Sequence, residues 1–88
     1  METIKTDCFG IVVELEDPNE WGDRNGTITS DLHEEPTDEW DTDHTIYNSM
    51  MDTIESMILA HACAGVDITD PAYICGIETA VLACANNI

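Results

Sequence analysis

Apolar and polar residues alternate in two segments near the front of the chain. Over Cys8–Leu15 the apolar side chains fall on every second position, which is the period of a strand with one buried face. These positions are Phe9, Ile11, Val13 and Leu15. The alternation returns over Thr27–Leu32, which we interpret as the partner strand, and residues 3–5 are expected to form a further short strand.

The segment between the two alternating runs is rich in residues that form turns, namely Pro18, Gly22 and the pair Asn25-Gly26. We therefore predict a long hairpin loop over Glu16–Gly26. Trp21 is the large apolar residue of this loop. Its ring either folds back onto the sheet or is an exposed contact residue, and the sequence leaves both interpretations open.

Residues 33–43, HEEPTDEWDTD, show no regular apolar period. Pro36 is incompatible with a continuous helix through this segment. Trp40 is its single large apolar side chain, and it is either an anchor to the core or a contact for a partner. We interpret the segment as an irregular acidic connection.

From about His44 the apolar residues recur every three or four positions, which is the period of an amphipathic helix. The expected inner positions are Ile46, Met50, Ile54, Met57, Ile58 and His61, with Met51 and Leu59 widening the stripe. Asp43 or Thr45 is the expected cap at the start of this helix, and Gly65 is suited to end it.

A second helix is expected to begin at Asp70-Pro71, with the aspartate as N-cap and the proline at the first helical position. Its predicted inner face carries Ile74, Ile77, Val81 and Cys84. Because the connection between the two helices is short, they are expected to run antiparallel.

These patterns together predict one small α+β domain over residues 1–88. An N-terminal antiparallel β-hairpin or three-stranded sheet (residues 1–32) is followed by the acidic connecting segment (33–43). A C-terminal antiparallel helix pair (44–88) then packs against the sheet. The pattern contains no internal repeat and no second domain.

The net charge of the chain says more about its function than any sequence motif does. The chain has 19 Asp and Glu residues against 2 Lys and Arg, a formal net charge of −17. Small domains usually carry a net charge of roughly 2–8 in magnitude, and a larger excess destabilises the folded state through self-repulsion. Most of the carboxylates fall within 14–43: Glu14, Glu16, Asp17, Glu20, Asp23, Asp31, Glu34, Glu35, Asp38, Glu39, Asp41 and Asp43.

Two interpretations of this acidic stretch are open. Solubility, or adaptation to a salty cytoplasm, would spread carboxylates over every exposed surface, whereas both helix patterns carry few. The uneven distribution favours a dedicated binding face for a basic partner. Trp21 and Trp40 would supply the apolar contacts that ion pairs lack.

The sequence gives little indication of disulfide bonds, metal binding or catalysis. The cysteines lie within apolar patterns without a CxxC motif, so we expect reduced, structural thiols. His61 and Cys63 do not share a helix face, and the carboxylates lie in exposed, turn-rich sequence. We therefore predict no enzyme activity, no cofactor and no specific metal site. The absence of a leader-like segment or an apolar run of about 20 residues predicts a soluble, intracellular protein; if the chain is of viral origin, this is the host cytoplasm.

Two parts of the chain resemble short acidic proteins of phages and prophages. They are the front segments CFGIVVEL and GTITSDL, and the run YNSMMDTIESMILAHACAGVDITDPAYICGIETAVLACANN. The resemblance implies a viral or mobile-element origin and no enzyme activity. Proteins of this kind include inhibitors of host defence, among them anti-CRISPR proteins and DNA-mimic anti-restriction proteins, to which the likeness is one of composition.

The sequence thus favours an inhibitor that presents a DNA-like acidic surface to the basic groove of a nucleic-acid-binding protein, such as a CRISPR effector or a restriction complex. Neither nucleic acid nor an anionic membrane is an expected direct partner, because both would repel this chain. The alternative is a structural or assembly module of a phage. It would self-associate, for example as a homodimer, through apolar helix residues outside the main stripes, such as Met51, Leu59 and Leu82. Its charge would then serve solubility.

Overall fold

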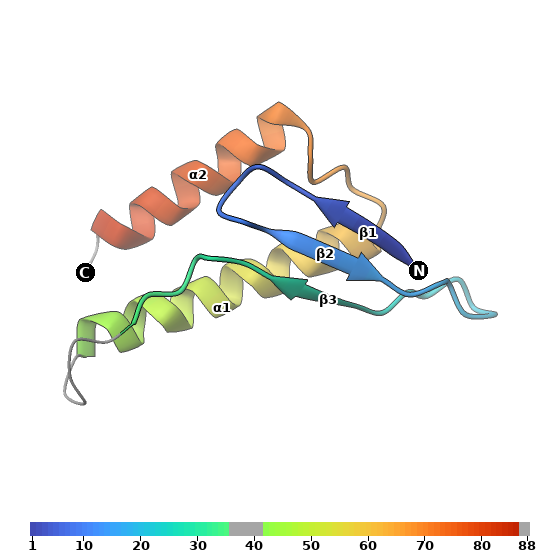
Figure 1. Ribbon diagram of the computed structural model, residues 1–88, viewed down its shortest axis with the longest axis horizontal. Coiled ribbons are helices and arrows are strands. Elements are labelled where there is room, and N and C mark those ends of the chain that lie inside the picture. Colours follow the sequence, from blue (N-terminus) through green and yellow to red (C-terminus); the bar gives the residue numbers. More distant parts are fainter. Residues whose placement is uncertain (36–41, 87–88) are drawn as a thin grey trace.

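The computed structural model of the protein describes residues 1–35 and 42–86. Three strands are followed by two helices (Figure 1): β1 (Glu2–Lys5), β2 (Val12–Leu15), β3 (Gly26–Thr29), α1 (Thr42–Cys63) and α2 (Pro71–Asn86). This is an α+β arrangement with a three-stranded antiparallel sheet, as the alternating patterns predict. The short strand expected near residues 3–5 is β1.

The sheet has the order β1-β2-β3, so β2 is the central strand. Val13 of β2 pairs with Ile4 on one side and with Ile28 on the other. Since paired residues point to the same face of a sheet, these three apolar side chains form a row on one face. The opposite face carries Val12 and Glu14 of β2 with Lys5 and threonines of the neighbouring strands, and it has no helix over it (Figure 1).

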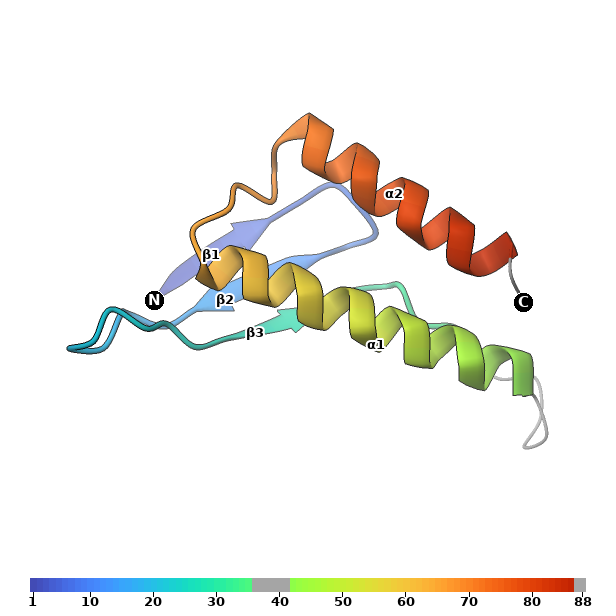
Figure 2. The same ribbon diagram turned by 180° about the vertical axis from the view of Figure 1, so that it is seen from behind.

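Helix α1 runs across the apolar face of the sheet, in front of the strands in Figure 2. Its buried side chains are Met51, Ile54, Ile58 and Ala62. Together with Val13 and Leu15 of β2, both almost completely buried, they form the centre of the core. Burying large apolar side chains in this way contributes about 1.5–3 kcal/mol each, and it is this contribution that holds the helix on the sheet.

The expected strand Cys8–Leu15 begins only at Val12, and Phe9 does not face the core. Thr6 N–H and Ile11 N–H donate to the carbonyl oxygens of Ile11 and Cys8, both at 3.0 Å, and so close a tight turn between β1 and β2. Its central residues, Phe9 (φ 51°) and Gly10 (φ 63°), both have positive φ, as a type I′ hairpin turn requires. The alternation therefore breaks at the turn, and Phe9 points outward.

The return strand is also shorter than expected, because β3 ends at Thr29 rather than at Leu32. Leu32 is nevertheless buried, as its position in the alternation predicts. Beyond β3 the chain runs beside α1 instead of beside β2 (Figure 2).

The stripe of α1 differs from the expected one. The helix begins at Thr42, so Asp43 and Thr45 lie inside its first turns rather than at the cap. Met51 is fully buried, whereas Ile46 and Met57 are exposed. The first turns of α1 extend past the sheet (Figure 1), which leaves Ile46 without a strand to cover.

The connection between the helices agrees with the sequence prediction. Gly65 has φ 91°, and its N–H donates to Ala62, while Val66 N–H donates to His61 at 2.9 Å. This pair of bonds is the Schellman motif that ends a helix at a glycine. At the start of α2, the Asp70 carboxylate accepts a 2.8 Å hydrogen bond from Ala72 N–H and so caps the helix.

Helix α2 runs opposite to α1 in both views (Figures 1 and 2) and packs on α1 and on the turn between β1 and β2. Ile77 and Val81 are its buried residues, with Ile74 and Cys84 partly buried, as predicted. In the part of the chain that the structure describes, no helix is long and apolar enough to cross a membrane.

Candidate partner-binding surface

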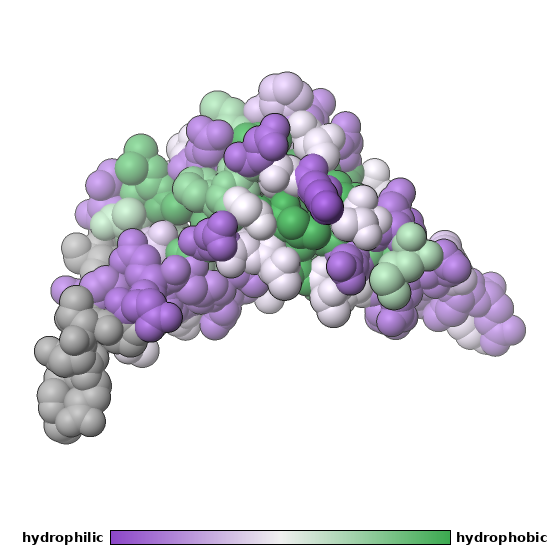
Figure 3. All heavy atoms as spheres, in the orientation of Figure 1, coloured by the Kyte–Doolittle hydropathy of each residue, from purple (hydrophilic) through white to green (hydrophobic). Residues whose placement is uncertain are grey.

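The fold divides the acidic stretch between two ends of the molecule rather than gathering it on one face. The hairpin loop after β2 projects from one end, and the segment after β3 reaches the other (Figure 1). Figure 3 shows hydrophilic surface at both ends and more apolar surface between them. We name the first group, Glu16, Asp17, Glu20 and Asp23, the acidic tip. Glu14 lies between the two groups, exposed on the open face of the sheet.

The acidic tip is an ordered loop held by Asn19. The Asn19 side-chain oxygen accepts hydrogen bonds from Trp21 N–H at 2.9 Å and from Asp23 N–H at 3.0 Å. Gly22 completes the turn with φ 83°. Trp21 is 80% exposed, which decides between the two interpretations that the sequence leaves open. The indole does not fold back onto the sheet but stands in solvent among carboxylates.

Arg24 forms its bonds with other residues of the same chain. Its Nε donates to the Glu16 carbonyl oxygen at 2.9 Å, and its guanidinium is 3.5 Å from the Glu2 carboxylate. The N-terminal amine lies 3.4 Å from Asp17. Glu20 and Asp23 have no ion pair among these contacts, and they remain exposed on either side of Trp21.

At the other end, residues 33–35 lie along α1 and form what we name the acidic ridge. The sequence predicts three of its described carboxylates, and the fold adds two from α1: Glu34, Glu35, Asp43, Asp52 and Glu55. All but Glu55 are exposed. Asp31, which the sequence also predicts as a contact, lies instead against the turn between β1 and β2, with its side chain beside Gly10 and its N–H bonded to the Phe9 carbonyl oxygen. The predicted contacts Asp38, Glu39, Trp40 and Asp41 lie outside the described residues.

Asp52 and Glu55 join the ridge through His33. The two imidazole nitrogens of His33 face different carboxylates, with Nε2 2.6 Å from Asp52 and Nδ1 3.2 Å from Glu55. Glu55 also accepts a 2.6 Å hydrogen bond from the Ser30 hydroxyl. Sequence reasoning misses this contact, although the spacing of Asp52 and Glu55 already places both on one side of a helix.

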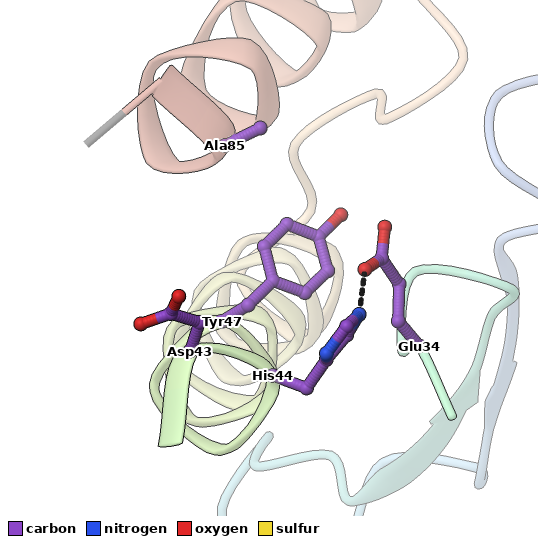
Figure 4. A pocket seen from close by; sticks show the side chains of 5 residues that line it. All are labelled: Glu34, Asp43, His44, Tyr47 and Ala85. Carbon is purple, nitrogen blue, oxygen red and sulfur yellow. Dashed lines mark ion pairs between the residues drawn. The ribbon is translucent and has the colours of Figure 1, made fainter. Parts of the chain in front are cut away.

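A small pocket of about 210 Å³ opens where the ridge meets the first turns of α1. Figure 4 shows its lining, with the Tyr47 ring between Glu34 and Asp43, and Ala85 of α2 opposite. His44 Nε2 lies 3.0 Å from a Glu34 carboxylate oxygen. Burial, then the nearby Glu34 charge and Cys84, raise the pKa of the Tyr47 hydroxyl, so the ring remains neutral at physiological pH.

The cysteines are free thiols. Cys8 is buried as its pattern predicts, Cys63 and Cys84 are partly buried, and Cys75 is exposed, which its apolar surroundings in the sequence do not predict. Within residues 1–35 and 42–86, no group of three or more His, Cys, Asp or Glu side chains is arranged to hold a metal ion.

Comparison of the chain with protein-family models, with curated proteins and with solved structures gives no match.

Proposed function

We propose that the protein is a phage-encoded inhibitor that binds a basic, nucleic-acid-binding defence complex of its host, of the anti-CRISPR or anti-restriction kind. One observation supports this proposal above the others. Among the described residues, the acidic ridge forms ion pairs with histidines only, whereas Arg24 is bound to Glu16 and Glu2 near the acidic tip. The negative charge of the ridge can therefore attract a basic partner.

The acidic tip fits insertion into a basic groove. The backbone of Trp21 is held by Asn19 and its ring is 80% exposed, so the indole offers a large contact area on an ordered loop. Glu20 and Asp23, exposed at nearby positions of the same loop, can pair with Lys or Arg of the groove. Trp21 thus supplies the apolar anchor, while the acids attract and orient the partner.

The pocket of the acidic ridge suits a single basic side chain. The methylene groups of a Lys or Arg can lie against the Tyr47 ring while its charged head reaches Glu34 and Asp43. The C-terminal end of α2, whose last turn has no basic residue, adds a partial negative charge near Ala85. The site would thus take the place of a phosphate that the same basic residue normally binds.

The two acidic groups are separated along a molecule that measures 46 Å in its longest direction. Duplex DNA rises about 3.4 Å per base pair on each strand, so this length corresponds to slightly more than one helical turn. The protein would contact the DNA-binding groove of its partner at two separated points instead of imitating a continuous row of phosphates.

The test is capture from a host lysate at about 50 mM and about 0.5 M salt, where the Debye length falls from near 14 Å to near 4 Å. A DNA-binding defence complex should be retained at low salt, released at high salt and displaced by added duplex DNA. In purified form it should lose DNA binding when the protein is added.

Two double variants locate the contact. Glu20→Gln/Asp23→Asn removes charge from the tip, and Glu34→Gln/Glu35→Gln removes charge from the ridge. Each should weaken binding at least about tenfold, whereas Glu2→Gln/Asp67→Asn, which removes two exposed charges outside the acidic tip, the acidic ridge and the groove between the β1–β2 turn and α2, should change it much less. Equal effects of all three double variants, or capture that duplex DNA does not reverse, would contradict the proposal.

The structure weakens one argument for the alternative, a self-associating assembly module. Of the three helix residues that suggest a spare apolar face, Met51 is fully buried, Leu59 is partly buried, and only Leu82 is exposed. Light scattering at several protein concentrations separates the two functions, because a module of this kind would be oligomeric without any partner.

A further inference from the structure

The turn between β1 and β2 meets α2 in an open apolar groove of about 540 Å³. Phe9 of the turn and Leu82 of α2 line it, 38% and 62% exposed, with Val81 and Ala85 beside them. Apolar surface over α2 is visible in Figure 3. Two exposed carboxylates, Asp7 and Glu78, line the same groove.

The outward position of Phe9 is imposed by its backbone. A bulky residue at φ 51° is an outlier, because the side chain crowds the backbone in this conformation, and Gly or Asn would be relaxed there. The turn is nevertheless fixed on both sides. The Thr6 hydroxyl accepts a hydrogen bond from Cys8 N–H at 3.2 Å, and the Phe9 carbonyl oxygen accepts one from Asp31 N–H at 2.8 Å.

An aromatic ring that is exposed by a strained, well-held backbone is better explained by binding than by stability. Nothing in the core requires phenylalanine at this position, since Phe9 points away from it. The apolar groove therefore has the features of a contact site that is formed before the partner arrives.

Charge decides which partner fits the groove. Asp7 and Glu78 flank its apolar floor, and Glu78 lies close enough to add to the effect of burial in raising the pKa of the Cys8 thiol. The last turn of α2 contributes a partial negative charge at the Ala85 end of the groove. A second copy of this chain would bring a net charge of −17 and only two Lys or Arg residues, so it would be repelled.

We propose that the Phe9–Leu82 groove is a second docking site, separate from the acidic tip and ridge, for a basic amphipathic segment of a partner protein. An apolar side chain of that segment would enter between Phe9 and Leu82. Lys or Arg residues one helical turn away would reach Asp7 and Glu78. This is binding of a helix in a groove with charged flanks.

Two synthetic peptides of equal length and charge test the site. One contains Leu and Lys in an amphipathic helical pattern, and the other has Ala in place of every Leu. Attraction by charge alone would bind both equally. The groove should instead bind the Leu/Lys peptide at least about tenfold more tightly, with NMR shift changes concentrated at residues 7–10 and 78–85.

The variant Phe9→Asn/Leu82→Gln should reduce this preference to about twofold or less. Asn accepts the positive φ of position 9, so thermal unfolding of the variant should occur at or above the wild-type temperature. Met57→Gln, which changes another exposed apolar residue on a helix, should keep the full preference. Glu34→Gln/Glu35→Gln should weaken both peptides alike, which separates this site from the acidic ridge.

Three outcomes would overturn the proposal. The first is equal affinity for the two peptides, and the second is a preference that survives in Phe9→Asn/Leu82→Gln. The third is a concentration-dependent dimer of the wild-type protein, seen by sedimentation equilibrium and abolished in that variant, because the groove would then be covered by a second copy. If Phe9→Asn proves less stable than wild type, the single variant Leu82→Gln, at an exposed helix position, is used instead. It should also reduce the preference for the Leu/Lys peptide over the Ala peptide.

Discussion

The side chain of Asn48 on α1 binds both backbone groups of Glu34. Its Oδ1 accepts a hydrogen bond from Glu34 N–H, and its Nδ2 donates one to the Glu34 carbonyl oxygen, each at 2.8 Å. The side-chain amide of Asn48 thus makes the pair of hydrogen bonds that a neighbouring strand would otherwise make with Glu34. This contact places the acidic ridge beside α1 together with the bonds of His33 and Ser30 to that helix and the buried Leu32.

Asn48→Ala should loosen that segment at Glu34 while α1 remains folded, because His33 and the buried Leu32 still hold the residues before it. Two exposed hydrogen bonds are lost, so we expect the free energy of unfolding to fall by about 1 kcal/mol. Hydrogen exchange at the Glu34 amide should become much faster, and partner binding through the ridge should weaken. Urea unfolding and amide exchange followed by NMR measure both effects.

Ser49→Ala is the matched control, because Ser49 is the exposed neighbour on the same helix. It should change the free energy of unfolding by less than about 0.5 kcal/mol. Unchanged exchange at the Glu34 amide in Asn48→Ala would show that another contact holds the ridge in place.

The acidic ridge shows which features of this protein can be predicted from its sequence and which cannot. The alternation around Val13 and the capping residues Gly65 and Asp70 are local signals, and the structure agrees with them. The addition of Asp52 to an acidic surface built from residues 33–35 depends on where α1 crosses the sheet. No periodicity in either segment contains that information.

Phe9 and Met51 are two positions where the hydrophobic pattern alone does not predict whether a side chain is buried. The alternating pattern extends through Phe9, but Gly10 forms a turn with it, and this glycine is the signal that favours a break. For α1, an apolar stripe wide enough to include both Ile46 and Met51 cannot show which edge meets the sheet. Packing selects Met51.

The four thiols should react with an alkylating reagent in an order set by the fold. Burial, followed by the charge of Glu78, raises the pKa of the Cys8 thiol. Since the thiolate is the reactive form, Cys8 should be modified last. Cys75 is exposed and should be modified first. Timed labelling with iodoacetamide and peptide mass spectrometry measures the order.

Cys75→Ser should remove the fast phase and leave the slow one unchanged. Addition of urea should bring Cys8 to the rate of an unfolded thiol. Early modification of Cys8 in the native protein would mean that the turn between β1 and β2 opens more often than its hydrogen bonds indicate.

Asp67, in the connection between the helices, should titrate at lower pH than an ordinary aspartate. The Thr69 hydroxyl donates to its carboxylate at 2.5 Å and the Thr69 N–H at 3.0 Å, and these bonds lower the Asp67 pKa. A lowered pKa in the folded state stabilises the fold above the unfolded value of 3.8. That contribution is lost as the pH falls through the lower, folded-state pKa.

Carbon-detected NMR titration measures the Asp67 pKa directly. Thr69→Val removes the hydroxyl bond, which has the larger effect, and should move the pKa most of the way back to its ordinary value. Thr69→Ser should preserve the shift. A Thr69→Val protein with an unchanged Asp67 pKa would assign the shift to other groups.

Glycine-to-alanine substitution should have opposite effects on stability at Gly26 and Gly76. A Cβ at Gly26 would lie 2.6 Å from the Glu14 carbonyl oxygen and 2.8 Å from a Leu15 methyl group. Gly26 pairs with Leu15 across β2 and β3, so the strands would have to separate to admit the methyl group. We expect Gly26→Ala to lower the free energy of unfolding by about 1–3 kcal/mol.

Gly76 lies on the exposed side of α2, where an added Cβ would meet no atom within 4 Å. Alanine there gains helix propensity without a clash, so Gly76→Ala should raise the free energy of unfolding by roughly 0.5–1 kcal/mol. Urea denaturation of both variants under identical conditions gives the comparison. Both variants add the same methyl group, so changes of opposite sign in the free energy of unfolding are due to position alone. A Gly26→Ala variant that is more stable than wild type would show that β3 does not pair with β2 in the register described.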